Sequence, residues 1–194
     1  SNQMSSSTGQ VKQRNADCPA PSKLYQEWTP TNFDSYVTSL TANSYTYHDM
    51  GLLWGARLMS PTGIFAANNA PPDRDIQRHM VFMTDGDTNA NPGSTSYYDD
   101  APMYTAYGID YWDRRQNDGT SNPAKSWLDA NIDARTQAIC DWVKAKNITL
   151  WVIAFGSGVS DETKDRLALC ASPGKSYSAA DNTALTQQFN AIAA

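Results

Sequence analysis

Two aspartates, Asp85 and Asp87, directly follow a compact apolar run and offer the clearest chemistry in the sequence. The run HMVFMTDG (79–86) is too short for a buried helix and closes with a turn signal, which predicts a fully buried strand. In open α/β sheets, ligands bind beyond the carboxyl ends of the strands. Carboxylates at such an end can hold Mg²⁺ or another divalent cation, directly or through water. Alternatively, both aspartates only shape the turn through hydrogen bonds to their own backbone.

Other metal and enzyme signatures are scarce. Residues 85–91 resemble a calcium-binding loop, but Ala90 stands where that loop needs glycine and Ser96 where it needs glutamate. The chain has no phosphate-binding loop, dinucleotide fingerprint or nucleophile elbow. A catalytic triad would have to use His48 or His79, which are placed at the starts of a helix and a strand. The sequence therefore favours a non-enzymatic function.

A metal-assisted hydrolase that uses Asp85 and Asp87 is the enzymatic alternative. It is disfavoured because neither a general base nor a nucleophile is close to these residues in the sequence.

A long irregular stretch at about 87–123 is rich in aromatic side chains. They are interleaved with aspartates, and amphipathic rings in a loop suit contact with a protein or a carbohydrate. The alternative is a small local core that holds the loop in place. The candidate contact residues are Tyr97, Tyr98, Tyr104, Tyr107, Tyr111 and Trp112.

Composition limits the partners. The 194 residues hold 15 Lys and Arg against 20 Asp and Glu, a net charge of −5. This argues against nucleic acid, because a protein that neutralises phosphates needs a basic surface. The apolar stretches are far shorter than the roughly 20 residues of a membrane helix, so we expect no membrane segment. Residues 1–22 are polar and read as an arm or linker.

The remaining pattern alternates helices with apolar strands. Helical spacing begins at Thr31, the expected N-cap, and a second helix is expected over about 47–59 with Trp54 on its apolar side. A long helix at 124–146, with Trp142 on its apolar face, ends at Asn147 and precedes the strand ITLWVIAF (148–155). Ser160 and Asp181 are expected to cap two further helices, separated by a short edge strand at 175–178. The apolar side chains of the last helix, Phe189 among them, are expected to be buried. This order predicts a Rossmann-like α/β fold with a mainly parallel sheet and helices on both faces.

Several of these segments resemble the later two-thirds of a von Willebrand factor A-like domain. They are TYHDMGL (46–52), MVFMTDG (80–86) and LWVIAFG (150–156). More narrowly, GLLWGARLMSP (51–61), VFMTDGDTN (81–89) and the ending SYSAADNTALTQQFNAIA (176–193) are similar to the C-terminal region of TadG-like proteins. Those proteins are membrane-anchored, extracytoplasmic components of the bacterial tight-adherence (Flp) pilus assembly apparatus. The resemblance covers about residues 17–194, within an expected domain at 23–194.

The resemblance implies that Thr46 and Asp85 contribute to a metal-ion-dependent adhesion site. The family's Asp-x-Ser-x-Ser element, which supplies the closest metal ligands from a central strand, has no counterpart in residues 1–194. The domain is therefore expected to be incomplete, with weak cation binding and an unpaired sheet edge. Such an edge must be covered by rearrangement or by another chain, which makes a homodimer or strand exchange a hypothesis.

The three cysteines, Cys18, Cys140 and Cys170, are too few for a disulfide framework, and the residues alone leave open whether they are buried thiols or bonded. The extracytoplasmic context of the TadG-like family permits disulfides. The resemblance thus favours a Cys140–Cys170 pair and leaves Cys18 without a partner.

The expected function is a non-enzymatic adhesion or protein-interaction domain of a pilus assembly or bacterial surface protein. Its partner surface would combine the strand ends with the aromatic loop at about 92–127, with a divalent cation assisting only if the missing Asp-x-Ser-x-Ser element is supplied. Glycan binding by the Tyr- and Trp-rich loop is the alternative.

Overall fold

The computed structural model describes residues 2–4, 11–13, 20–42, 45–69, 76–90, 104–109, 115–116 and 124–193. The chain forms two compact units. Unit 1 comprises Ser1–Pro21, Trp28–Tyr47 and Asn89–Ile132, and unit 2 comprises Ser22–Glu27, His48–Thr88 and Asp133–Ala194. Each unit is described by itself below.

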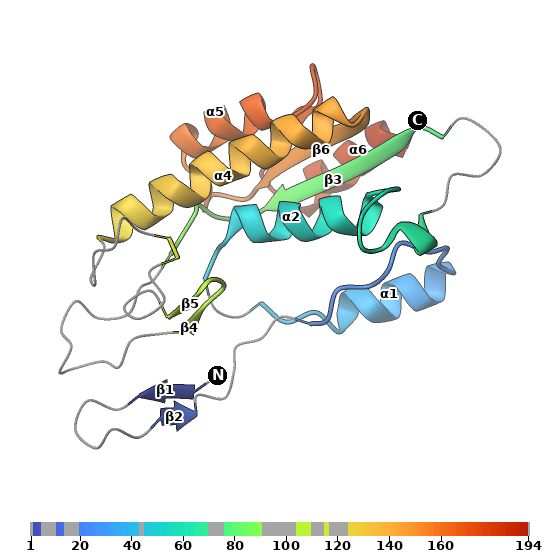
Figure 1. The fold of residues 1–194 in the computed structure, drawn as a ribbon. Helices are drawn as coiled ribbons and strands as arrows, with labels where there is room; N and C mark the ends of the chain where they lie inside the picture. The colour runs from blue at the N-terminus through green and yellow to red at the C-terminus, as the bar shows by residue number, and fades with distance from the viewer. Residues whose placement is uncertain are drawn as a thin grey trace. The chain divides into compact units, whose positions relative to one another are not determined.

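A parallel sheet of three strands forms the centre of unit 2 (Figure 1). Its strands are β3 (Arg78–Thr84), β6 (Ile148–Phe155) and β7 (Ser176–Ala179), in the order β3-β6-β7. The pairing runs without interruption from Arg78 opposite Ile148 to Thr84 opposite Ala154. This confirms the predicted α/β class with a parallel sheet.

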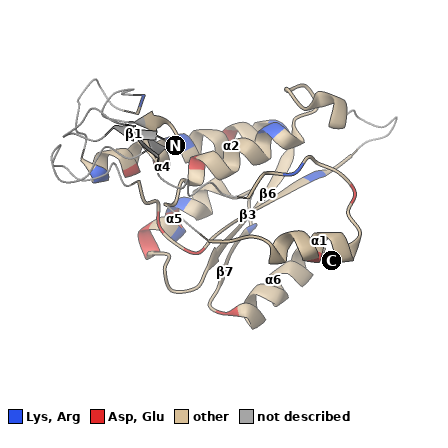
Figure 2. Cartoon of the chain, turned by 90° about the horizontal axis from the view of Figure 1, so that it is seen from below, with Lys and Arg blue, Asp and Glu red and all other residues tan. Residues whose placement is uncertain are grey.

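Helices cover both faces of this sheet. α2 (His48–Met59), the second part of α4 (Lys125–Ala145) and α5 (Asp161–Cys170) contribute to one core with the strands. α6 (Asn182–Ala193) lies on the opposite side of the sheet from α2 (Figure 2). A short 3₁₀ helix, η1 (Ala66–Asn68), follows α2.

The main core fills the space between the sheet and the first group of helices. Leu150 and Val152 of β6 are fully buried there, together with Leu52 of α2 and Val143 of α4. Because side chains alternate between the two faces of a strand, Trp151 and Ile153 point to the other face, where they are 5% and 0% exposed. β6 is therefore buried on both faces, as expected for a central parallel strand.

The prediction that β3 is buried on both faces is wrong. Met80 and Thr84 are buried on the core face, but on the other face Val81 and Met83 are 40% and 47% exposed. These side chains are exposed because β3 is an end strand of the described sheet and has a neighbouring strand, β6, on one side only.

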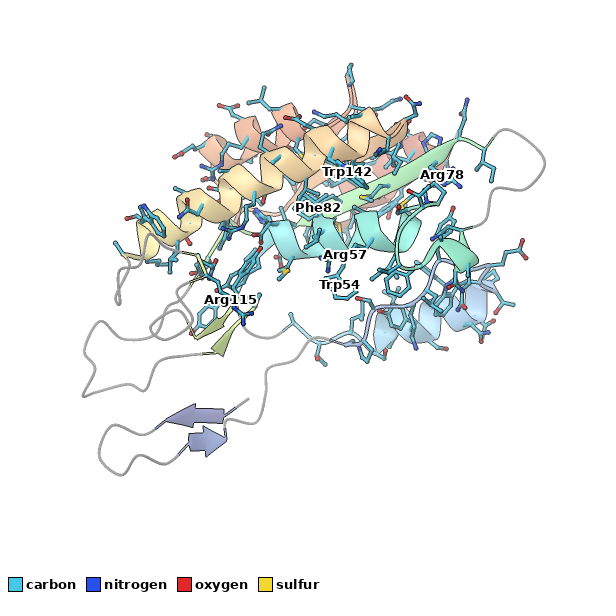
Figure 3. The ribbon with its side chains drawn as sticks, in the orientation of Figure 1. Trp54, Arg57, Arg78, Phe82, Arg115 and Trp142 are labelled. Atoms are coloured by element: carbon cyan, nitrogen blue, oxygen red, sulfur yellow. A yellow bond between two sulfur atoms is a disulfide. The ribbon has the colours of Figure 1, made fainter. Side chains whose placement is uncertain are left out.

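Several expected helix faces also differ from the structure. In α2 the buried residues include Leu52, Ala56 and Met59, whereas Trp54 is exposed and stacks with Arg57 on the side turned away from β3 (Figure 3). In α4, Trp142 is 44% exposed. α6 has no buried residue, although its apolar side chains were expected inside.

The helix ends are closer to the prediction. Ser160 caps α5 by accepting a hydrogen bond from the Thr163 N–H at 3.2 Å, and Asp181 caps α6 through the Ala184 N–H at 2.8 Å. Asn147 ends α4 in the left-handed conformation (φ 56°), which asparagine tolerates.

Unit 1 contains the short elements. β1 (Asn2–Met4) and β2 (Val11–Gln13) pair antiparallel within the predicted arm, and β4 (Tyr104–Thr105) pairs with β5 (Gly108–Ile109) within the predicted loop. α1 (Pro30–Thr38) is capped by Thr29 rather than by the expected Thr31, because Pro30 at the first helical position starts the helix earlier.

A disulfide joins Cys140 of α4 to Cys170 of α5, with a Cα–Cα distance of 5.1 Å. Both cysteines are at most 1% exposed and belong to the main core. This is the pair that the resemblance favours. Cys18 lies outside the described residues. No helix within the described ranges is long and apolar enough to cross a membrane.

Candidate functional site

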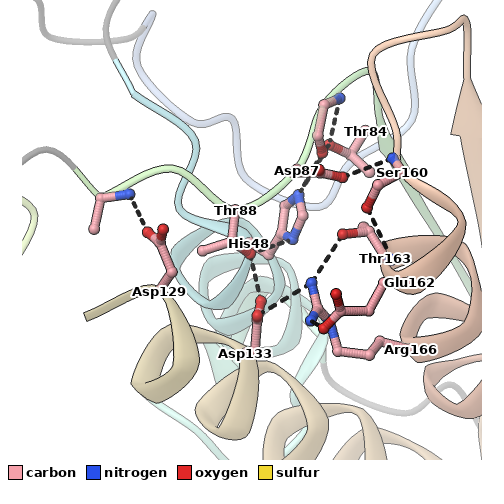
Figure 4. Close-up of polar contacts among 12 residues, drawn as sticks. His48, Thr84, Asp87, Thr88, Asp129, Asp133, Ser160, Glu162, Thr163 and Arg166 are labelled. Atoms are coloured by element: carbon pink, nitrogen blue, oxygen red, sulfur yellow. Dashed lines mark hydrogen bonds and ion pairs between the residues drawn. The ribbon is translucent and has the colours of Figure 1, made fainter. Parts of the chain in front are cut away.

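The carboxyl end of the sheet in unit 2 gathers the polar side chains of the site (Figure 4). Four segments meet there: the turn after β3 at residues 85–88, the loop after β6 at residues 156–160, the start of α2, and α4 near Asp133. All of them belong to unit 2. This is the location that a parallel sheet predicts for ligand binding.

Asp85 is an exposed carboxylate at this end of the sheet. It directly follows β3, and its backbone is closely approached by the loop after β6. A Cβ atom added to Gly158 would come within 3.0 Å of the Asp85 carbonyl oxygen. Gly158 therefore lets the two loops touch, and that contact fixes the backbone on which Asp85 is presented.

Asp87 is partly buried and is hydrogen-bonded within the protein. Its Oδ1 accepts a hydrogen bond from the Ser160 N–H at 2.8 Å, at the amino end of α5. Desolvation acts to raise the pKa of Asp87, but hydrogen bonds from Ser160 and Thr163 outweigh it and hold this pKa below its usual value. Asp87 thus links the turn after β3 to α5, and this is a structural role.

His48, the first residue of α2, is 4% exposed, and both of its ring nitrogens contact polar atoms of the protein. Its Nε2 lies 3.0 Å from Thr84 Oγ1 and 3.1 Å from the Gly86 carbonyl oxygen. Its Nδ1 lies 2.9 Å from Thr88 Oγ1. Since a carbonyl only accepts, the contact with Gly86 requires a proton on Nε2. The ring therefore holds the turn after β3 against the start of α2.

Thr88 extends this contact to α4. Its hydroxyl donates to Asp133 Oδ1 at 2.5 Å and also contacts His48 Nδ1. The Thr88 hydroxyl has one proton and can donate to only one of these two partners. Both contacts are hydrogen bonds at the same time only if the imidazole or the carboxyl carries an additional proton. Burial lowers the pKa of His48 and outweighs the opposing influence of the Gly86 carbonyl and the Asp133 carboxylate. The imidazole is therefore neutral at pH 7.

Arg166 of α5 completes the network. Its guanidinium lies 3.2 Å from Asp133 Oδ2, 2.9 Å from Glu162 Oε1 and 2.8 Å from Thr163 Oγ1. His48, Asp133 and Arg166 also line a hollow of about 230 Å³ between α4 and α5, with Leu167 on its wall. The charged groups of this hollow are paired with one another, so the network joins α2, α4 and α5.

A second ion pair, in which the carboxylate is buried, stabilises the first turn of α2. Asp49 is 0% exposed; its Oδ2 lies 2.7 Å from Arg135 Nε of α4, and its Oδ1 accepts from the Met50 N–H at 2.8 Å. A carboxylate in the first helical turn also suits the helix dipole.

The two residues that the resemblance assigns to a metal site belong to different units. Thr46 lies in unit 1, where two backbone hydrogen bonds of 3.2 and 2.9 Å pair it with Asn89. Asp85 lies in unit 2. Within the part of the chain that the structure describes, no three His, Cys, Asp or Glu side chains form a metal-binding group.

Of the candidate contact residues in the aromatic loop, the structure describes one side chain, that of Tyr107. The Tyr107 ring is half-buried and lies 6.4 Å from the Tyr47 ring, which packs on the small core of unit 1 formed by Ala90, Leu128 and Ile132. This contact agrees with the local-core alternative for Tyr107. Tyr104 belongs to β4. The candidates Tyr97, Tyr98, Tyr111 and Trp112 lie outside the described residues.

The network of His48, Thr88, Asp133 and Arg166 is the main feature that sequence reasoning missed. Thr88 is 40 residues from His48 and 45 from Asp133, so no local pattern connects them. The one local signal was the placement of His48 at a helix start beside a predicted metal-site threonine.

Comparisons of this chain with known protein families, with curated proteins and with solved structures give no match.

Proposed function

We propose that this chain is a non-enzymatic protein-interaction domain that binds its partner at the carboxyl end of the sheet, with a divalent cation assisting at Asp85. We further propose that it has a von Willebrand factor A-like fold of the TadG-like type and acts in bacterial pilus assembly or at the cell surface. The three-stranded parallel sheet with helices on both faces is compatible with this family.

The proposal rests on one observation, the contrast between Asp85 and the carboxylates around it. Asp85 is exposed, whereas Asp87 is bonded to α5, Asp133 to Thr88 and Arg166, and Asp49 to Arg135. Two further carboxylates at the start of α5, Asp161 and Glu162, are also exposed, but each is paired with a basic side chain of the same helix. Divalent cations such as Mg²⁺ prefer oxygen ligands and accept ligands from a partner as well as water. Among the described carboxylates of this end, Asp85 is thus the exposed one with no ion pair or side-chain hydrogen bond, which makes it available to an external ligand.

The bonding of His48 supports a non-enzymatic role. A general base must reach a proton of the substrate, but both nitrogens of this buried ring contact groups of the protein. The geometry is that of a structural histidine that fixes three segments around Asp85.

The proposed extracytoplasmic location is supported by the core disulfide, because such bonds persist mainly in oxidising compartments. The sequence motifs quoted for the TadG-like family support the assignment to pilus assembly.

Calorimetric titration with Mg²⁺, Mn²⁺ and Ca²⁺ tests the proposal. We expect weak, saturable binding, since an incomplete ligand set leaves most coordination positions to water. Asp85→Ala should abolish this binding. The matched control is Asp141→Ala, which removes a carboxylate that is 64% exposed on α4, away from the sheet end.

Cation binding that Asp85→Ala removes and Asp141→Ala leaves intact supports the proposed site. Equal loss in both variants would indicate diffuse attraction to an acidic surface, and unchanged binding in Asp85→Ala would contradict the role of Asp85. An absence of binding in the wild type would refute cation assistance by this chain alone.

A further inference from the structure

The sequence of β3 lacks the features that usually protect an edge strand. Within the described sheet β3 pairs with β6 alone, over seven residues in unbroken register. The sequence RHMVFMT contains no proline and no lysine, and its one full charge, Arg78, stands at the first position. Short length, bulges, proline or inward charges normally prevent edge-to-edge pairing. Among the residues that the structure describes, no other strand pairs with this edge, so its outward backbone groups can accept another strand.

The side chains beside this edge are apolar on the exposed face. Val81 and Met83 are 40% and 47% exposed, whereas their cross-strand neighbours Trp151 and Ile153 on the same face are buried. On the opposite face, Met80 and Phe82 lie against α2 near Gly55 and Gly51. An added strand would place its own side chains beside Val81 and Met83 and cover part of this apolar surface.

The ladder determines which backbone groups point outward. In a parallel pair, alternate residues direct their N–H and C=O to opposite sides. Val152 donates to the Lys175 carbonyl on the β7 side, so Trp151 and Ile153 face β3. Their register partners Val81 and Met83, and by the same alternation His79, direct N–H and C=O to the open edge.

We propose that this edge pairs with the β3 edge of a second copy of the chain, antiparallel about a two-fold axis at Val81. In this register Val81 pairs with Val81 of the partner subunit, and His79 with Met83 of the partner subunit. Each of these outward residues then exchanges hydrogen bonds with its counterpart. On the core face Met80 pairs with Phe82 of the partner subunit, so apolar residues meet on both faces.

The self-complementarity of β3 is the argument for a second copy as the occupant. An interface with a two-fold axis uses the same surface on both subunits, and the strand meets this condition on both faces. A single seven-residue edge is smaller than the roughly 800 Å² per partner of a standard complex, so we expect a weak, concentration-dependent dimer. The inference deepens the proposed function by naming the partner at one surface. Cation titration and sedimentation test the two separately.

Sedimentation equilibrium with a charge-swap pair tests the proposal. The wild type should change from monomer to dimer over a range of roughly 10 µM to 1 mM, as expected for a small interface. Val81→Lys and Val81→Glu should each weaken the dimer at least about tenfold, because like charges then meet across the axis. An equimolar mixture of the two variants should associate again, because residue 81 faces its own copy.

The matched control is Leu169→Lys, which places the same charge at a 69% exposed leucine of α5, away from the edge. It should dimerise as the wild type does, and far-UV circular dichroism should show that every variant is folded. A wild type that stays monomeric, a Val81→Lys variant that dimerises fully, or a mixture that fails to associate would each overturn the proposal. A monomeric wild type would mean that the β3 edge does not bind a second copy of the chain.

Discussion

The contact between Gly158 and the Asp85 backbone gives a quantitative test of how the site is built. In Gly158→Ala, the new Cβ would lie closer to the Asp85 carbonyl oxygen than the 3.0 Å limit of real Cβ contacts, and it would also meet the Asp85 carbonyl carbon at 3.5 Å. The neighbouring atoms are backbone, so they cannot move aside as a flexible side chain would. Overpacking of this kind costs about 1–3 kcal/mol. Alanine also lowers the conformational entropy of the unfolded chain, which stabilises the folded state by about 0.4–1 kcal/mol.

We therefore expect Gly158→Ala to lower the free energy of unfolding by about 1–2 kcal/mol, measured by urea denaturation with circular dichroism detection. Two neighbouring glycines serve as controls. Gly86 has nothing within 4 Å of an added Cβ, so Gly86→Ala should be neutral or slightly stabilising. Gly156 has equal space but a φ of +74°, so Gly156→Ala should cost about 1 kcal/mol from backbone strain alone. Equal stability of Gly158→Ala and Gly86→Ala would refute the close approach of the two loops.

Three further perturbations test the groups that hold the site together. Because burial holds the pKa of His48 below 6.5, the unfolded state binds the proton more readily, so thermal stability should fall as pH decreases from about 7 to 5. Replacing His48 with Gln should flatten this slope. Replacing both Cys140 and Cys170 with Ala should lower the free energy of unfolding by about 3 kcal/mol in urea denaturation, because their separation of 30 residues closes a moderate loop. Asp49→Asn should cost about 2–4 kcal/mol, since it leaves the partly exposed Arg135 without its buried counter-charge.

Each of these predictions has a specific contradiction. The prediction for His48 is contradicted if the pH dependence of stability persists in the His48 variant and disappears when the exposed His79 is replaced. That result would show that His79 causes the pH dependence. An unchanged urea midpoint after removal of the disulfide would mean that the core packing alone holds α4 to α5. For the ion pair, Asp141→Asn is the control, because its exposed pair with Lys144 is worth at most about 1 kcal/mol. Equal costs for Asp49→Asn and Asp141→Asn would show that burial of Asp49 adds nothing.

The local parts of the fold could be predicted from the sequence because their signals are local. The strand at 148–155 is a continuous apolar run, and the structure confirms its bounds. Ser160 and Asp181 were predicted as caps and act as caps, since a cap depends on the residues within one helical turn. The prediction of Thr31 as the cap of α1 is wrong, because Pro30 occupies the first helical position and the cap is Thr29.

The burial of individual faces could not be predicted in the same way. Val81 is apolar and lies in a strand, but its exposure depends on β3 being the end strand of the described sheet, which the sequence of β3 does not encode. Trp54 and Phe189 are large apolar residues that the helix pattern assigned to the interior, and both are at least 40% exposed. An apolar side chain on a helix is buried only if another element covers it.

In the candidate site, too, the local features were predictable from the sequence and the long-range contacts were not. Asp85 and Asp87 were located correctly at the end of a strand, but their different roles depend on α5, whose Ser160 is 73 residues away from Asp87. The ion pair between Asp49 and Arg135 spans 86 residues. Contacts of this range arise from the tertiary fold and have no local pattern.

The central claim, that the carboxyl end of the sheet binds a cation at Asp85, is tested most directly by paramagnetic broadening with Mn²⁺. In ¹H–¹⁵N spectra of the wild type, we expect the strongest loss of signal at the amides of Asp85, Gly86 and Gly158, which lie together at this end of the sheet. Asp85→Ala should restore those signals. Broadening that centres on other acidic residues, or that is unchanged in Asp85→Ala, would contradict the claim.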